Sequence, residues 1–232
     1  INSDLNIVDG LPLAWMARRL GIPVKRRVTG SGMFEALMAG SAQSARRLSV
    51  YFFGGREGAA EAACRNLNAG ESGLTGCGAH YPGFGTVQEL SDQATIDRIN
   101  ASNADFLVVA LGARKGQDWI EHNRRRLTVP VISHLGAVVN FVAGTVDRAP
   151  AWVQRFGMEW LWRIKEEPAL WSRYWHDGVG MLNLMTKRLL PYMAYLGIRR
   201  AMPFRLPDQA SARLVETASG ECRIAISGAV PD

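Results

Sequence analysis

Short apolar runs rich in β-branched and aromatic residues alternate with helical patterns, and this alternation constrains the fold more than any other feature of the chain. The predicted strands are 49–53, 74–79, 106–111 and 129–135, and the predicted helices between them are 57–67, 88–101 and 117–127. Strands that alternate with helices are typical of a parallel sheet covered by helices. We therefore predict an α/β fold with a Rossmann-like, mostly parallel sheet flanked by helices.

Glycine-led turns follow three of the predicted strands, at Gly54-Gly55, Gly112-Ala113 and Gly136-Ala137. Because parallel α/β sheets bind ligands beyond the carboxyl ends of their strands, we expect these turns to face one crevice. Backbone N–H groups at Gly54-Gly55 suit a phosphate, although the same glycines suit a plain tight turn. Lys115 and Gln117 could contact a diphosphate or sugar hydroxyls; a solvated loop, with Asp118 as a helix cap, is the alternative.

Asp9 lies in the turn Asp9-Gly10-Leu11-Pro12, directly before a helix predicted over 13–20. A short carboxylate held at a turn can serve as a general base, and it can equally cap the helix that follows. His134 ends a predicted strand and could face the crevice, although a structural histidine is the favoured interpretation.

The 232-residue chain has a formal net charge of +6, which favours an anionic partner such as nucleic acid, a phosphorylated small molecule or an acidic membrane surface. Its hydrophobic content of 47% is enough for one medium-sized core. Three widely spaced cysteines without a CxxC pair argue against a disulfide framework and a zinc site, and favour a reducing cytoplasm. The chain begins at Ile1, and we expect a segment upstream of it.

Arginines and tryptophans recur together in a stretch predicted to be helical. They are Arg148, Arg155, Arg163 and Arg173, with Trp152, Trp160, Trp162, Trp171 and Trp175. Guanidinium groups that converge on a pyrophosphate are one interpretation, and cation–π stacking within a helical bundle is the other.

The C-terminal part combines apolar residues with cations. The stretch 179–196 is apolar with few charges, and 187–205 carries lysine and arginine but no acidic residue. This pattern suits an amphipathic membrane-surface helix, or a core helix with a basic exposed face. We predict an α/β domain over 1–178 and a helical, Arg/Trp-rich, membrane-associating appendage over 179–232, with a loosely held tail beyond residue 206.

The segment from Ala143 to Pro168 is the most specific part of the sequence. It contains Ala143-Gly144, Arg148-Ala149-Pro150-Ala151-Trp152, Gly157-Met158-Glu159-Trp160 with Arg163, and Glu167-Pro168. These elements resemble the pattern aG…RAPxW…GLEWxxR…EP of the WecG/TagA/CpsF family, glycosyltransferase family 26. The similarity extends over about residues 2–191, with support from Asp9-Gly10, Gly30 and Gly54-Gly55.

The resemblance implies an inverting glycosyltransferase that needs neither a metal nor a cofactor. Such an enzyme would transfer a sugar from a UDP-sugar to a polyprenyl-diphosphate-linked acceptor at the inner face of the cytoplasmic membrane. Its partners would be these two substrates and the membrane surface, with no nucleic acid, and a homo-oligomer is compatible with the pattern. The arginine-rich C-terminal part would close over the site and touch the membrane.

The resemblance also assigns roles to individual residues. Asp9 matches the aspartate proposed as the catalytic base of the family, and Arg148 is the second catalytic candidate. No DxD-type acidic pair is evident, so arginines and backbone N–H groups are expected to stabilise the leaving UDP. The candidate substrate-binding residues are Gly10, Gly54, Gly55, Gly112, Ala113, Lys115, Gln117, Gly136, Asn140, Glu159 and Arg163.

The sequence departs from the family pattern near three of these positions. Arg114 and Gly116-Gln117 replace parts of the family's GxPKQE element, Asn140 replaces the acid of GxxFDF, and Gly32 replaces an early aspartate. These differences indicate a subgroup with its own donor sugar, in cell-surface or exopolysaccharide synthesis. Two rival classes are a nicotinamide-dependent Rossmann oxidoreductase, which lacks the full glycine fingerprint here, and a basic anion-binding module.

Overall fold

The computed structural model describes residues 3–25, 27–41, 46–147, 149–150, 152–153, 156–201, 211–216 and 222–227. Contacts between residues divide the chain into two compact units, Ile1–Trp175 and His176–Asp232. The first unit contains a four-stranded sheet, and the second contains most of a long helical run followed by a β-hairpin.

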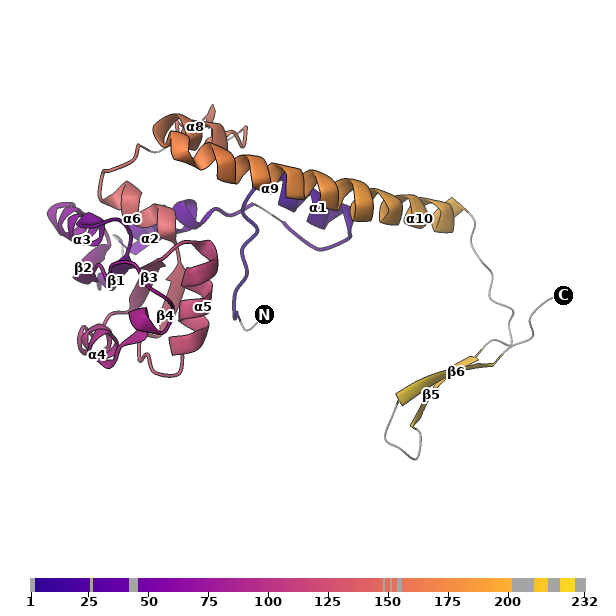
Figure 1. Cartoon of the computed structure of the whole chain (residues 1–232), viewed down its shortest axis with the longest axis horizontal. Coiled ribbons are helices and arrows are strands. Elements are labelled where there is room, and N and C mark those ends of the chain that lie inside the picture. Colours follow the sequence, from indigo (N-terminus) through magenta and orange to yellow (C-terminus); the bar gives the residue numbers. More distant parts are fainter. Residues whose placement is uncertain are drawn as a thin grey trace. The chain divides into compact units, whose positions relative to one another are not determined.

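A parallel sheet forms the centre of the first unit (Figure 1). Its strands are β1 (Leu48–Gly54), β2 (Leu74–His80), β3 (Phe106–Ala110) and β4 (Val131–His134). They lie in the order β2-β1-β3-β4, and each neighbouring pair is parallel. The predicted α/β fold with a parallel sheet is therefore confirmed, and the four predicted strands are all present.

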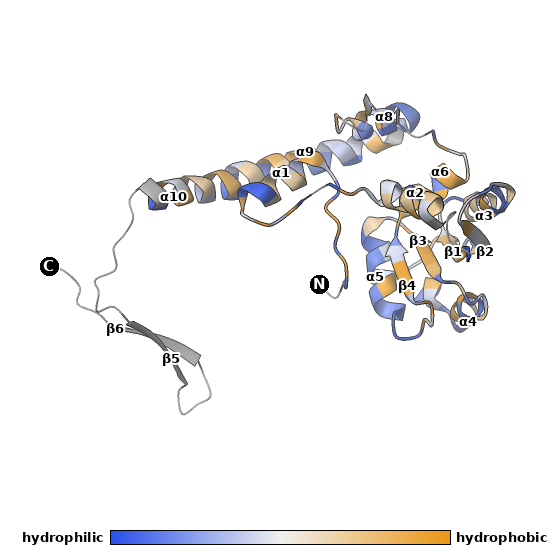
Figure 2. Ribbon diagram, turned by 180° about the vertical axis from the view of Figure 1, so that it is seen from behind, coloured by the Kyte–Doolittle hydropathy of each residue, from blue (hydrophilic) through white to orange (hydrophobic). Residues whose placement is uncertain are grey.

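Helices cover both faces of this sheet (Figure 1). The first unit contains α1 (Leu11–Arg19), α2 (Gly30–Ser41), α3 (Ala59–Ala69), α4 (Gln93–Ala101), α5 (Ala113–Asn123), α6 (Gly136–Val142) and α8 (Glu159–Glu166), with 3-10 turns η1 (Glu89–Ser91) and η2 (Pro168–Leu170). Alternate residues of a strand point to opposite faces, so Val50 and Phe52 pack with α2, α3 and α6, while Tyr51 and Phe53 pack with α4 and α5. In Figure 2 the hydrophobic colour is clearest in β3 and in part of β4.

The structure adds two helices that the sequence did not predict, α2 and α6, and it changes two of the predicted ones. The helix predicted over 88–101 is interrupted at Asp92, whose carboxylate accepts a hydrogen bond from the Thr95 N–H (2.8 Å) and so begins α4. The helix predicted over 117–127 begins instead at Ala113, directly after Gly112, which has a φ of +83°. Lys115 and Gln117 therefore lie on α5, and Asp118 lies inside this helix rather than capping it.

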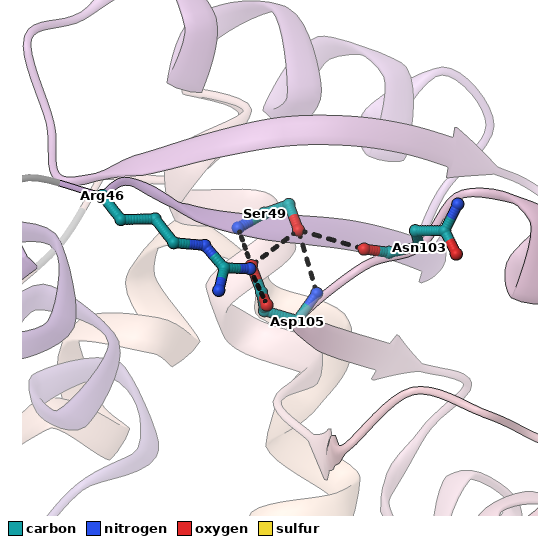
Figure 3. Close-up of polar contacts among 4 residues, drawn as sticks. All are labelled: Arg46, Ser49, Asn103 and Asp105. Carbon is teal, nitrogen blue, oxygen red and sulfur yellow. Dashed lines mark hydrogen bonds and ion pairs between the residues drawn. The ribbon is translucent and has the colours of Figure 1, made fainter.

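A polar cluster joins the starts of β1 and β3, at the amino-terminal end of these strands and opposite the glycine turns (Figure 3). Asp105 accepts hydrogen bonds from the N–H of Ser49 (2.9 Å), from its hydroxyl (2.8 Å) and from Arg46 (2.6 Å). The Ser49 backbone N–H, followed by its hydroxyl and then Arg46, holds the pKa of Asp105 below its ordinary value. The cluster fixes the register of the two central strands at their amino-terminal ends.

A continuous helical run enters the second unit. It consists of α9 (Trp171–Leu184), a π-helical turn η3 (Met185–Leu189) and α10 (Leu190–Ala201). The antiparallel strands β5 (Ser211–Glu216) and β6 (Cys222–Ser227) follow and form a hairpin that was not predicted, while a loosely held tail beyond residue 206 stays a prediction. Among the residues that the structure describes, no helix is both long and apolar enough to cross a membrane.

Candidate active site

A pocket of about 200 Å³ opens beyond the carboxyl end of β4. Its walls come from separate parts of the first unit: Asp9 before α1, the first turn of α2, the β4–α6 turn, Asp147, and α8. Parallel α/β sheets bind ligands at the carboxyl ends of their strands, so the fold itself favours a site here. We call this hollow the polar pocket, because Asp9, Asp147, Glu159 and Arg163 all line it.

The polar pocket contains only part of the predicted site. Asp9, Gly136, Glu159 and Arg163 line it, although they lie far apart in the sequence. The predicted residues that do not line it are Gly10, Gly54, Gly55, Gly112, Ala113, Lys115, Gln117 and Asn140. Arg148 and Arg155 lie outside the described residues. Of the three glycine turns expected to share one crevice, only Gly136-Ala137 reaches this pocket.

Asp9 is an exposed residue at the rim of the pocket and does not cap α1. The N-cap position belongs to Gly10, which has a φ of +93°, and no side chain caps this helix. The helix-cap interpretation of Asp9 is therefore wrong, and the carboxylate faces the pocket without that structural role.

Two glycines bring the walls of the pocket together. A Cβ atom at Gly30 would lie 2.6 Å from Leu135 Cδ2, so a glycine here lets the first turn of α2 approach the β4–α6 turn. A Cβ atom at Gly157 would lie 2.2 Å from Leu11 Cδ1, so this glycine lets the segment before α8 approach α1. Both glycines belong to the motifs of the resemblance, and their close contacts place Asp9 and Glu159 around one hollow.

Helix α8 is held over the pocket mainly by polar contacts. None of its residues is buried. Glu159 pairs with Arg27 (3.8 Å), and the indole N–H of Trp162 donates to the carbonyl of Asp147 (3.2 Å). The guanidinium of Arg163 lies over the ring of Phe141, 5.7 Å from its centroid, which is a cation–π contact with a residue outside the predicted set.

Two polar atoms beside the pocket are buried and have no hydrogen-bond partner among the described residues, namely Arg163 Nε and His134 Nε2. A buried polar atom without a partner is costly, so each of these two atoms needs an explanation, and a bound substrate would give it a partner. His134 lies at the end of β4, and a Cβ atom at Gly116 would be 2.1 Å from its Cδ2, so the glycine makes room for the ring. The sequence allowed His134 to face the crevice because it ends a strand, and in the structure the residue lines the polar pocket.

The pKa of His134 lies below its ordinary value, first because the ring is buried and then because Arg173 is close. The nearby backbone of Gly112 and of His134 itself favours the charged form less strongly. A neutral imidazole is therefore expected near pH 7, and it adds no positive charge to the pocket.

The Gly54-Gly55 turn lies in close contact with the end of β3. The N–H of Gly55 donates to the carbonyl of Ala110 (2.8 Å), and a Cβ atom at Gly54 would meet this carbonyl at 2.8 Å. In the same loop, Arg56 forms an ion pair with Glu167, just beyond α8. Lys115 Nζ donates to the carbonyl of Gly85 (2.8 Å).

Within the described part of the chain, no group of three or more histidine, cysteine or acidic side chains is arranged to hold a metal ion.

The model of the Glycosyl transferase WecG/TagA/CpsF family matches residues 1–194. The chain belongs to this family. The matched region includes the whole sheet and every residue that lines the polar pocket. In this WecG/TagA/CpsF protein, the elements Asp9-Gly10, Gly30 and Gly157–Arg163 meet at one pocket, although they are widely separated in the sequence.

Three curated relatives share the same name, N-acetylglucosaminyldiphosphoundecaprenol N-acetyl-β-D-mannosaminyltransferase. The chain is 27% identical over 172 residues to the one from Bacillus spizizenii and 25% identical over 179 residues to the one from Bacillus subtilis. Each match covers 74% of this chain and 64% of the relative. The relative from Staphylococcus aureus is 23% identical over 157 residues, covering 68% of this chain and 59% of the relative. The chain thus spans less than two thirds of the length of these relatives.

Proposed function

We propose that this chain transfers a sugar from a UDP-sugar to a sugar linked through diphosphate to a polyprenyl lipid, with inversion at the anomeric carbon. The observation that carries the proposal is the convergence of Asp9, Glu159 and Arg163 on the polar pocket. Family membership and the names of the relatives, which include a diphosphoundecaprenol-linked sugar and a β-linked product, support the class of substrate.

Asp9 is the proposed general base. Its carboxylate takes the proton from the acceptor hydroxyl while that oxygen attacks the anomeric carbon of the donor, and the bond from this carbon to the phosphate oxygen of UDP breaks. A carboxylate that lines the pocket and does not cap a helix is available for this proton transfer. The departing UDP carries away the electron pair of the broken bond.

Cationic and dipolar groups are proposed to stabilise the leaving diphosphate. Arg163 lines the polar pocket, and Arg148 belongs to the same family motif but lies outside the described residues. Thr29, Gly30 and Ser31 bring the start of α2 to the pocket, where the positive end of a helix favours an anion. Glu159 and Gly136 would contact the sugars, while Lys115, Gln117, Asn140 and the remaining glycine turns are proposed for parts of the substrates beyond this pocket.

The C-terminal part is proposed to associate with the membrane that carries the acceptor. Its helical run exposes large apolar side chains, among them Val179, Leu182, Leu190, Tyr195 and Ile198. Lys187, Arg188 and Arg199 belong to the same run, and this combination suits a helix lying in an anionic membrane surface. Residues 1–178 would then catalyse transfer while residues 179–232 hold the protein at the inner face of the cell membrane.

Ligand-dependent thermal stability separates this proposal from its rivals. UDP should raise the melting temperature of the protein, because binding to the folded state alone stabilises it. NAD and a short oligonucleotide serve as the comparison ligands. Stabilisation by NAD alone would favour an oxidoreductase, stabilisation by the oligonucleotide alone would favour an anion-binding module, and either result would contradict the proposed function.

A further inference from the structure

A second hollow, of about 340 Å³, adjoins the polar pocket. Ser31, Val138 and Phe141 line both hollows, so the two share a wall. The second hollow lies between α2, α3 and α6, on one face of the sheet. We call it the apolar groove.

The lining of the apolar groove is mostly hydrocarbon. Phe34, Leu67 and Val138 form its base, and only 2% of each residue is exposed to solvent. Met38 and Val142 are half-buried members of its walls, and Glu35 and Asn66 complete the lining. An apolar hollow that opens beside a polar site is a common design for binding a ligand with two chemically different parts.

We propose that the apolar groove binds the first isoprene units of the acceptor lipid while the diphosphate and sugar of the same molecule occupy the polar pocket. This inference rests on the proposed function. Of the two proposed substrates, only the polyprenyl-linked acceptor joins a charged head directly to a hydrocarbon chain. The shared wall at Ser31, Val138 and Phe141 supplies the required continuity from one hollow to the other.

The test compares two acceptors that carry the same sugar diphosphate, one esterified to a long isoprenoid and one to a methyl group, both in the same detergent with the full-length protein. Met38→Gln places a polar amide in the groove, and Val142→Phe fills it. Met33→Gln is the matched control, because Met33 is also a half-buried residue of α2 packed on the same core but does not line the groove. Kinetic constants are measured for both acceptors and for the UDP-sugar.

The wild-type protein should have a much lower KM for the isoprenoid acceptor than for the methyl acceptor. Met38→Gln and Val142→Phe should each raise the KM for the isoprenoid acceptor about tenfold, roughly the effect of losing two buried methylene groups. Both should leave the KM for the methyl acceptor and for the UDP-sugar unchanged, and Met33→Gln should preserve the wild-type ratio of the two acceptor KM values.

An unchanged ratio of acceptor KM values in both groove variants would overturn the inference while leaving the proposed function intact. If Met38→Gln converted a wild-type dimer into a monomer, as measured by light scattering, and left this ratio unchanged, the groove would bind a second copy of the chain instead. A wild-type protein that transfers sugar to neither acceptor would overturn the proposed function itself, and this inference with it.

Discussion

Replacing Asp105 by asparagine should destabilise the fold without slowing the proposed reaction. The carboxylate accepts two bonds from Ser49, at 2.9 and 2.8 Å, and one from Arg46. The Arg46 side chain is 74% exposed, so its ion pair contributes little, whereas the two bonds from Ser49 are charge-assisted and better shielded from water. Asparagine loses the charge and part of this acceptor capacity, and we expect a loss of about 2–4 kcal/mol in the free energy of unfolding.

Urea denaturation of the wild type, Asp105→Asn, Ser49→Ala and the double variant measures this loss and its coupling. Ser49→Ala removes only the hydroxyl, so it should cost about half as much, and the double variant should lose less than the sum of the single variants. Because the pKa of Asp105 is depressed in the folded state, its stabilisation is present above about pH 4 and is lost as pH falls through the folded pKa. A loss below about 1 kcal/mol, or additive single variants, would refute this account of the cluster.

Three further predictions concern the polar pocket. Asp9→Asn should unfold at the wild-type urea midpoint but lose at least about 100-fold in kcat, and unchanged turnover would remove Asp9 as the base. Arg163→Gln should lower kcat/KM by about 100- to 1,000-fold in steady-state assays; a loss of stability alone would make this arginine structural. Gly116→Ala should displace His134 and cost about 1–3 kcal/mol in urea denaturation, because the new Cβ atom would lie 2.1 Å from the ring; wild-type stability would contradict that packing.

Local sequence signals predicted the sheet but not the details that depend on distant contacts. The runs around Phe52 and Val108 are apolar on both faces because helices cover both sides of the sheet, which made these strands easy to recognise. The start of α5 was misplaced because its first turn is polar and resembles a loop. The hairpin of β5 and β6 was missed although Ile224 and Ile226 alternate with smaller or polar residues along β6, which is a strand signal.

The candidate site was predictable where a motif carried it and not where packing did. Asp9, Glu159 and Arg163 came from motifs of the sequence, and all three line the polar pocket. His134 lines the pocket, as its position at a strand end allowed, whereas Asp147 was given no role. The close approach of Gly116 to the histidine ring could not be predicted, because no period or spacing in a single sequence reports a long-range contact.

Sugar transfer by the full-length protein is the most direct test of the proposed function. A panel of UDP-sugars, beginning with UDP-N-acetylmannosamine, is offered to a synthetic N-acetylglucosaminyl-diphosphate-lipid with and without EDTA, and the product is identified by mass spectrometry and NMR. The enzyme should transfer one sugar with inversion, at a rate that EDTA leaves unchanged. Absence of transfer from every UDP-sugar by the folded protein would contradict the proposed function, and loss of transfer in EDTA with recovery on adding a divalent metal would contradict the metal-independent mechanism.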